Sequence, residues 1–308
     1  MICAVCLNHC IDRTVEIEKF TYGGMNRIQA SREDGCGKGV NVALVARQMG
    51  MESACIGYLF EENGALISNR LKDAGVQEDC IWLPGRVRTN MKVFDRENSR
   101  ITEINESGAF ISEEDRARMV ALVRDWAGRC DTMVFTGSLP PECPADFYKT
   151  LMEATEGRCR CVLDAEGEKL TRGMEARPFL IKPNQYELEL RTGRELKTVQ
   201  DIKKAALECV SEGVAIVAVS LGGDGAFITD GAHSYFAPVV PVNVRSTVGA
   251  GDSMVTGFLH GLTLGEDLRG IFRRGVAAGT AAVTTEGTQL LTRALYEEML
   301  ERVIIEEV

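Results

Sequence analysis

Residues 246–262, which begin STVGAGDS, combine a turn of small residues with a carboxylate. The apolar residues that follow Asp252 recur at helical spacing, so residues 249–251 lie where a helix begins. Backbone N–H groups at a helix N-terminus bind anions. A carboxylate beside an anion site suits the transfer of a phosphoryl group to an alcohol, with Asp252 taking the hydroxyl proton. The residues alone also allow Asp252 to be a plain N-cap.

A second glycine segment, GCGKGVN at residues 35–41, also precedes a helical pattern. Lys38 and Asn41 can donate hydrogen bonds there, although a purely structural turn fits the residues as well. The segment is not a P-loop, because Gly39 stands where that motif needs Ser or Thr. It is not a dinucleotide fingerprint either.

Cationic and amide side chains alternate along residues 86–92. Arg86, Arg88, Asn90 and Lys92 share one face of a strand by period two. The chain has 35 basic and 45 acidic residues, a formal charge of −10, so an anionic substrate needs such a local cluster. The cluster suggests a site for a sugar phosphate, and a solvated strand face explains it too.

Several weaker signals remain open. KPNQYE at residues 182–187 offers Asn184 and Glu187 to a phosphate-bound metal or to water, or forms a turn with a helix cap. The strand at 217–220 runs into LGGDG and is expected at a sheet edge. Asp164, at the end of a strand, suits a metal or a helix cap. His9 with scattered cysteines makes a poor metal site.

The elements that position these residues alternate between strand and helix. Strands are predicted at 1–7, 53–58, 131–136, 159–163, 179–182 and 214–220, and helices at 40–49, 65–74, 113–128, 145–155, 199–212, 252–264 and 268–284. This alternation predicts an α/β fold with helices on both faces of a parallel sheet. Residues 12–33 and 87–107 read instead as polar-alternating strands, which predicts a small inserted sheet, or lid. The main domain then comprises residues 1–11, 34–86 and 108–308.

The composition excludes several classes of protein. With 308 residues, 45% hydrophobic and 26% charged, the chain is globular rather than disordered. Its acidity predicts no nucleic-acid partner, and the lack of about 18 consecutive apolar residues predicts no membrane span. The first residues lack the pattern of a secretory signal, so the eleven cysteines are expected to be reduced thiols in the cytoplasm.

The motifs STVGAGDS, GKGVN, KPNQYEL, TGSLPP and VSLGGDGA occur together, and their order resembles that of the ribokinase-like, PfkB-type carbohydrate kinases. The resemblance covers nearly the whole chain and implies a three-layer αβα fold with a small β lid. LN-x-x-IDRTVE, RTNMKV and TEINESG resemble the branch that phosphorylates sugar phosphates, the 1-phosphofructokinases, with tagatose-6-phosphate kinases and 6-phosphofructokinases as relatives. This implies transfer from ATP, with Mg²⁺, to fructose 1-phosphate, giving fructose 1,6-bisphosphate.

The resemblance also implies a role for each motif residue. The catalytic group would comprise Asp252 as general base, with Gly249, Ala250 and Gly251 as the anion hole. The residues that hold the sugar and its phosphate would be Asp12, Gly37, Lys38, Asn41, Arg88, Asn90, Lys92 and Ser138. The residues near ATP would be Lys182, Asn184, Glu187, Ser220, Gly222, Gly225 and Thr285, with Mg²⁺ near Glu187 and Asp164. The lid in this family often pairs two subunits, which implies a homodimer.

Two departures from the family pattern bear on substrate preference. Cys36 stands where the family usually has glycine, and His9 and Cys10 stand where Asn8 is usually followed by Pro-Ala. Two further functions fit the same scaffold: a kinase of an unphosphorylated sugar or nucleoside, and a non-catalytic sugar or nucleotide sensor. The cluster at 86–92 argues against the first, and the intact GAGD turn argues against the second. A dinucleotide oxidoreductase lacks its fingerprint.

Overall fold

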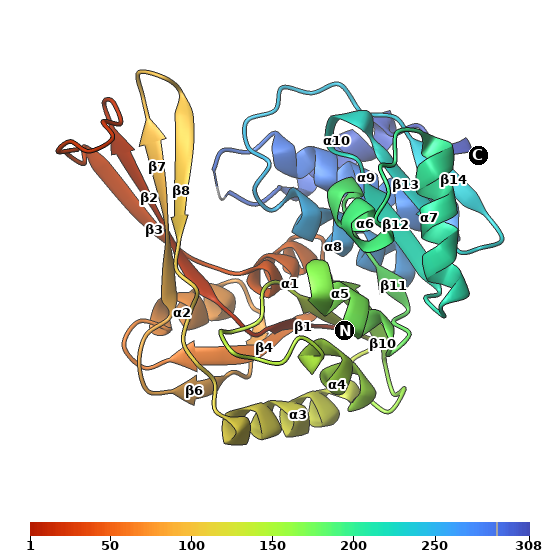
Figure 1. Ribbon diagram of the computed structural model, residues 1–308, viewed down its shortest axis with the longest axis horizontal. Helices are drawn as coiled ribbons and strands as arrows, with labels where there is room; N and C mark the ends of the chain where they lie inside the picture. The colour runs from red at the N-terminus through yellow and green to blue at the C-terminus, as the bar shows by residue number, and fades with distance from the viewer. Residues whose placement is uncertain (288) are drawn as a thin grey trace.

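The computed structural model describes residues 1–287 and 289–308. The strands of its main sheet are β1 (Ile2–Cys6), β4 (Ser53–Phe60), β5 (Gln77–Glu78), β6 (Ile81–Leu83), β9 (Thr132–Thr136), β10 (Arg160–Asp164), β11 (Leu180–Ile181), β12 (Ile216–Ser220), β13 (Ala226–Thr229), β14 (Ser234–Ala237) and β15 (Glu306–Glu307). Their order is β15-β14-β13-β12-β11-β10-β9-β1-β4-β5, with β6 beside β4 (Figure 1). The sheet is parallel from β12 to β5, and β13, β14 and β15 add an antiparallel end.

The helices form two groups of neighbours. One group is α1 (Lys38–Gln48), α2 (Ala65–Asp73), α8 (Ala250–Thr263), α9 (Leu268–Val283) and α10 (Arg293–Arg302). The other is α3 (Glu113–Ala127), α4 (Phe147–Glu153), α5 (Gly167–Met174), α6 (Gln185–Thr192) and α7 (Val199–Ser211). Strands β1, β4 and β9 are buried along their whole length, as parallel strands are when helices cover both faces. The predicted α/β fold is confirmed.

The structure corrects the sequence prediction at the sheet end. The strand that ends at Ser220 is not an edge strand, because β13, β14 and β15 continue the sheet beyond it. These strands are only two to four residues long, too short for a clear alternation of apolar and polar residues. Helices α5 and α10 were also not predicted; they are eight and ten residues long, near the lower limit for a periodic signal.

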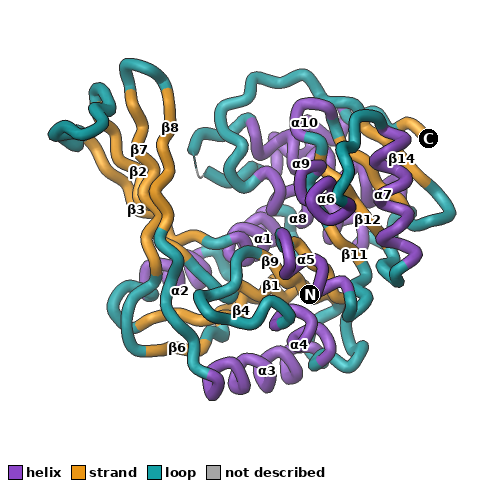
Figure 2. The backbone as a smooth tube through the Cα atoms, in the orientation of Figure 1, coloured by secondary structure: helices purple, strands orange, loops and turns teal. Residues whose placement is uncertain are grey.

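A second sheet projects from the body of the molecule (Figure 1). Its strands are β2 (Cys10–Ile17), β3 (Ala30–Cys36), β7 (Arg88–Asp95) and β8 (Arg100–Asn105), in the order β3-β2-β7-β8. The register places Asp12 beside Asn90 and Cys10 opposite Cys36. Segments 12–33 and 87–107 thus carry most of this sheet, which we call the lid sheet, and Figure 2 shows the loops at its outer end.

All eleven cysteines are free, and seven of them are buried. In residues 1–287 and 289–308, no three His, Cys, Asp or Glu side chains converge to hold a metal ion. No helix in the same ranges is both long and apolar enough to cross a membrane.

Candidate active site

A cavity of about 900 Å³ lies where strand ends of the main sheet meet the lid sheet. Its wall combines residues of the lid sheet, the start of α1, the ends of β9 and β12, and helices α8 and α9. The predicted residues on this wall are Asp12, Gly37, Lys38, Asn41, Arg88, Asn90, Lys92, Ser138, Lys182, Asn184, Glu187, Ser220, Gly222, Gly225, Gly249, Ala250, Gly251 and Asp252. Predicted residues as far apart in the chain as Asp12 and Asp252 therefore share one site.

The start of α8 has the geometry on which the predicted anion site depends. Gly249 is the N-cap, and its φ of +76° is a left-handed conformation that glycine adopts without strain. Ala250 N donates to Thr247 O at 3.3 Å. The N–H groups of Gly251 and Asp252 have no backbone acceptor among the described residues, so they remain available to an anion. Because Gly249 occupies the N-cap position, Asp252 is not a capping residue.

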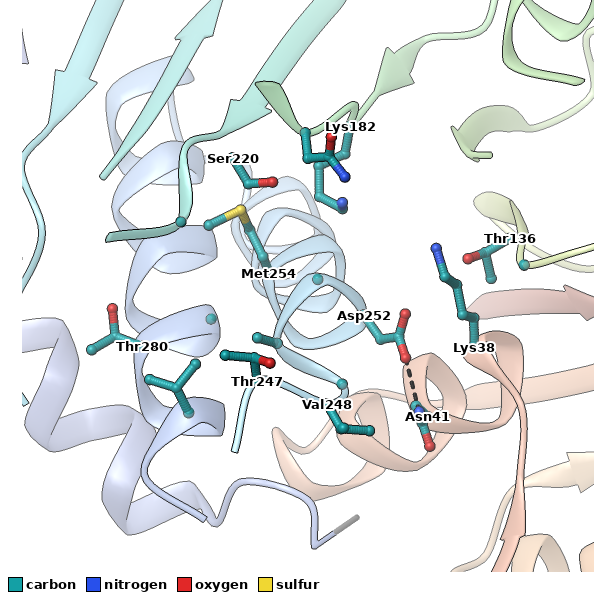
Figure 3. Close-up of a pocket in the computed structure, with 18 of the residues that line it drawn as sticks. Lys38, Asn41, Thr136, Lys182, Ser220, Thr247, Val248, Asp252, Met254 and Thr280 are labelled. Carbon is teal, nitrogen blue, oxygen red and sulfur yellow. Dashed lines mark hydrogen bonds between the residues drawn. The ribbon is translucent and has the colours of Figure 1, made fainter. Parts of the chain in front are cut away.

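The Asp252 carboxylate is buried beside this helix start. Asn41 Nδ2 donates to Asp252 Oδ2 at 2.8 Å, a bond drawn in Figure 3. Burial raises the pKa of Asp252 to about 6; the Asp164 charge adds to the rise, while Lys38 and Asn41 oppose it. A carboxyl group with this pKa can exchange a proton near neutral pH, which is what a general base requires.

Asp164 forms the centre of a buried ionic group. Its Oδ1 lies 3.1 Å from Lys182 Nζ, and its Oδ2 lies 3.3 Å from Lys38 Nζ and accepts a bond from Thr136 Oγ1 at 3.0 Å. Burial alone would raise the pKa of Asp164, but Lys182 and Lys38 hold it well below its usual range. Asp164 therefore positions two ammonium groups beside Asp252. This differs from both predicted roles, since its oxygens face cations and the N-cap of α5 is Glu166.

Asn184 and Glu187 begin helix α6 as a capping box. Asn184 Oδ1 accepts from Glu187 N at 2.8 Å, and Glu187 Oε2 accepts from Asn184 N at 2.8 Å. The structural alternative for KPNQYE is thus confirmed, although both side chains also lie on the cavity wall. Burial raises the pKa of Glu187.

Asp12 anchors a polar network on the lid sheet. Lys92 Nζ lies 2.7 Å from Asp12 Oδ2, and their side chains are only 9% and 8% exposed. Asn90 Nδ2 donates to Asp12 Oδ1 at 3.3 Å, while Asn90 Oδ1 is buried without a partner among the described groups. A buried carbonyl oxygen without a donor costs free energy, so a ligand hydroxyl at this point would stabilise the site.

Arg88 supplies a separate cation to the same wall. Its guanidinium donates to Glu106 O at 3.0 Å and to Asn8 O and Ser138 Oγ at 3.3 and 3.4 Å. Within the described part of the chain no carboxylate pairs with it, and its Nε is buried without a partner. Arg88 therefore has charge and donors left for an anion.

Arg86 does not join this wall, contrary to the period-two prediction. Strand β7 begins only at Arg88, and Arg86 is exposed, with its guanidinium 3.7 Å from Glu106 and 3.3 Å from Thr89 Oγ1. The alternation of side chains along a strand does not extend to a residue that precedes the strand.

The other half of the cavity is largely apolar. Residues 238–242 and 244 line it together with Met254, Val276, Gly279 and Thr280. Figure 3 shows Met254 and Thr280 on the far side of Asp252 from Lys38. Sequence reasoning missed this wall because residues 238–244 form an irregular loop without periodicity; its only signal was the PVVPV run. Thr285 is not on the wall, since its hydroxyl donates to the carbonyl groups of Ala282 and Gln289.

Known proteins are similar to this chain in sequence and in fold. The pattern of the pfkB family of carbohydrate kinases matches residues 2–294. The 1-phosphofructokinase of Rhodobacter capsulatus is 36% identical over 291 residues, which cover 94% of this chain and 92% of that protein. The 1-phosphofructokinase of Bacillus subtilis is 33% identical over 302 residues, which cover 97% and 98% of the two chains.

A solved structure superposes closely as well. Phosphofructokinase-2 from Escherichia coli, in complex with potassium, gives a TM-score of 0.92 at 29% identity, covering 97% of this chain and 98% of that one. The same protein is known in a tetrameric inhibited form, with a TM-score of 0.91. This chain therefore belongs to the pfkB family of carbohydrate kinases and is a phosphotransferase that acts on an alcohol group.

Proposed function

We propose that this enzyme phosphorylates fructose 1-phosphate with ATP, giving fructose 1,6-bisphosphate and ADP. One observation carries the proposal: the cavity contains both a buried carboxylate at an anion-binding helix start and a separate cation, Arg88, without a carboxylate partner among the described residues. A phosphorylated acceptor needs both, because its hydroxyl must lose a proton while its phosphate is bound elsewhere. The relatives named 1-phosphofructokinase support this acceptor.

The reaction is a direct transfer between two oxygens. Asp252 accepts the proton of the acceptor hydroxyl while that oxygen attacks the γ-phosphorus. The new O–P bond forms as the bond from the γ-phosphorus to the bridging oxygen breaks, and ADP leaves with the electron pair. Lys38, Lys182 and the N–H groups of Gly251 and Asp252 offset the charge of the transferring group. Asn41 holds the Asp252 carboxylate in position.

The donor set fits ATP with Mg²⁺. The apolar wall suits a purine base, and Ser220 and Gly222 at the end of β12 suit the polar part of a nucleotide. Mg²⁺ bound to ATP neutralises phosphate charge. Glu187 is the residue that would hold it, since Mg²⁺ in proteins takes one or two carboxylates besides substrate phosphates. Asp164 does not fit this role, because ammonium groups lie at both of its oxygens.

Turnover of different acceptors tests the proposal. ADP release is measured with ATP and Mg²⁺ on fructose 1-phosphate, tagatose 6-phosphate, fructose 6-phosphate and free fructose. We expect the highest kcat/KM with fructose 1-phosphate. A preference for tagatose 6-phosphate or fructose 6-phosphate would mean that the acceptor is a 6-phosphate, and the proposed mechanism would stay the same. Turnover of free fructose above the phosphates, or no turnover with folded protein, would contradict a phosphosugar kinase.

Arg88→Ala is expected to raise the KM for fructose 1-phosphate by about 10- to 100-fold, because it removes a charged hydrogen bond worth about 1.5–3 kcal/mol. The kcat should change less, because Arg88 lies on the lid sheet and not beside Asp252. Arg86→Ala is the matched control, since Arg86 is exposed and off the cavity wall. An unchanged KM in Arg88→Ala would favour an acceptor without a phosphate.

We also infer that two copies pair through their lid sheets. Apolar side chains at the outer end of this sheet are unusually exposed: Tyr22 96%, Met25 80% and Ile28 51%. Met25→Asp is therefore expected to shift a dimer toward monomer in sedimentation. Leu264→Asp is the control, because Leu264 is equally apolar, 54% exposed and outside the lid sheet. A wild-type chain that sediments as a monomer would contradict this pairing.

We also propose that the enzyme works in the cytoplasm. The eleven free thiols and the use of ATP fit a reducing, ATP-containing cytoplasm.

A further inference from the structure

The side-chain amide of Asn8 lies on the cavity wall, in the segment between β1 and β2. Its Nδ2 lies within hydrogen-bonding distance of three acceptors: Ser107 O at 3.0 Å, Ser138 Oγ at 3.1 Å and Leu139 O at 3.3 Å. Ser107 follows strand β8 of the lid sheet, whereas Ser138 and Leu139 follow strand β9 of the main sheet. One amide group therefore links the base of the lid sheet to the main sheet.

The orientation of the Asn8 amide follows from its partners. The carbonyl oxygens of Ser107 and Leu139 can only accept hydrogen bonds, so the amide nitrogen must face them. On the oxygen side, a methyl group added at Gly108 would overlap Asn8 Oδ1, so the glycine backbone packs directly against the amide. Asn8 is thus held at both ends of its amide and cannot turn over without breaking these hydrogen bonds.

Arg88 is held by the same group of atoms. Its guanidinium donates to three oxygens: Glu106 O at 3.0 Å, Asn8 O at 3.3 Å and Ser138 Oγ at 3.4 Å. Asn8 Nδ2 also donates to Ser138 Oγ, and it holds Ser107, the residue directly after Glu106. The Asn8 side chain thereby supports the oxygens that hold Arg88.

The charge of Arg88 is not neutralised by these contacts. The three oxygens that accept from it are uncharged. The Glu106 carboxylate is engaged elsewhere, because its Oε2 accepts from Thr89 N at 2.8 Å and its Oε1 lies 3.7 Å from the Arg86 guanidinium. A guanidinium held by neutral acceptors keeps its attraction for an anion.

The same contacts make the Ser138 hydroxyl a donor toward a ligand. A serine oxygen offers two acceptor positions and one O–H group. Asn8 Nδ2 and the Arg88 guanidinium occupy both acceptor positions, so the O–H group is the part of Ser138 that is left for a ligand. Phosphate oxygens accept hydrogen bonds and therefore suit this O–H group as well as they suit Arg88.

We propose that Asn8 is a positioning residue that orients Arg88 and Ser138 toward the phosphate group of the acceptor. It acts through these two side chains, since its own side-chain hydrogen bonds among the described residues do not include Asp252. The inference rests on the proposed function only where it identifies the anion as the acceptor phosphate. The preference of these donors for an anion follows from their own geometry.

Asn8→Ala tests this role through the parameters that it changes. We expect the dissociation constant of fructose 1-phosphate, measured by calorimetry without ATP, to rise about tenfold, because Arg88 and Ser138 must then be ordered by the ligand itself. The KM for this acceptor should rise similarly, while kcat and the KM for ATP should change less than about threefold. Asn98→Ala is the matched control and should leave these values unchanged, since Asn98 Nδ2 donates to Asp95 Oδ2 at 2.9 Å within the lid sheet but off the cavity wall.

A double-mutant cycle with Arg88→Ala separates positioning from a general structural effect. If Asn8 acts mainly through Arg88, Asn8→Ala should weaken binding about tenfold when Arg88 is present and about twofold or less when it is absent. A purely structural role would instead raise the KM for the acceptor and for ATP together, and by the same factor with or without Arg88.

Three results would overturn the inference: an unchanged dissociation constant in Asn8→Ala, equal effects of this substitution with and without Arg88, or parallel rises in both KM values. If Asn8→Ala fails to fold, Asn8→Asp decides, because it keeps the size of the side chain and removes its N–H groups. An unchanged affinity in that variant would likewise contradict the positioning role.

Inorganic phosphate gives a readout that does not depend on the identity of the sugar. With a non-hydrolysable ATP analogue on the donor side of the cavity, Asn8→Ala should weaken phosphate binding about tenfold. If it does so while the wild type fails to turn over fructose 1-phosphate, the positioning role stands and the proposed acceptor fails. If fructose 1-phosphate is turned over but neither ligand binds more weakly to Asn8→Ala, the proposed function stands and the positioning role fails.

Discussion

Asp252→Asn is expected to lower kcat by about 10³-fold, within the range that a general base contributes. The amide cannot accept the hydroxyl proton, but it has the same shape and can still contact Asn41. The KM for the acceptor and for ATP should therefore change little, and steady-state kinetics separates the two effects. A large rise in KM with chemistry intact would contradict the role of Asp252 as base.

The pH profile gives an independent readout of the same group. Only the ionised carboxylate accepts a proton, and burial raises its pKa to about 6 in the folded enzyme. The wild-type kcat/KM should therefore be level above this pKa and fall about tenfold per pH unit below it. Asp267→Asn is the matched control, since Asp267 caps helix α9 outside the cavity and Asn also caps helices. That variant should keep both the rate and the profile.

Asp164→Asn is expected to lower the free energy of unfolding by about 3 kcal/mol, because it leaves the Lys182 ammonium group buried without a counter-charge. The Lys182 side chain is only 6% exposed, whereas Lys38 at 46% can turn toward water. Urea denaturation measures the change. Glu175→Gln serves as the control, since it breaks an exposed ion pair with Lys149 and should have little effect.

Asp164→Asn should also shift the pH below which kcat/KM falls. The Asp164 charge raises the pKa of Asp252, so its removal lowers that pKa and shifts the limb to lower pH. A stability loss without this shift would mean that the ionic group supports the fold but does not influence the base. An unchanged free energy of unfolding in Asp164→Asn would contradict the buried ion pair of Asp164 with Lys182.

The sequence predicted the parts of the site that are local. The GAGD turn places its N–H groups and Asp252 within one helical turn, so their closeness could be inferred from four neighbouring residues. The order of the motifs predicted the family and the αβα fold, and both are confirmed. The polar alternation of residues 12–33 and 87–107 similarly indicated the separate lid sheet.

The parts that escaped prediction depend on distant segments or on backbone direction. The contact of Asp164 with Lys38 and Lys182 joins three segments whose meeting no local pattern shows, so Asp164 was expected near a metal. Thr285 was expected near the nucleotide, but the turn after α9 directs its hydroxyl to two carbonyl groups. The apolar wall at 238–244 has no secondary structure and hence no periodic signal.

A single residue separates the lid sheet from helix α1. Strand β3 ends at Cys36, α1 begins at Lys38, and Gly37 between them has a φ of +144° that favours glycine. The start of α1, which carries Asn41 and its bond to Asp252, is therefore directly continuous with the lid sheet. The consequence is stoichiometric: an acceptor held by the lid sheet brings its hydroxyl to the base and leaves less room there for water, so we expect the acceptor to be a far better recipient than water. ATP consumption should then match sugar phosphorylation closely, with little futile hydrolysis when the acceptor is scarce.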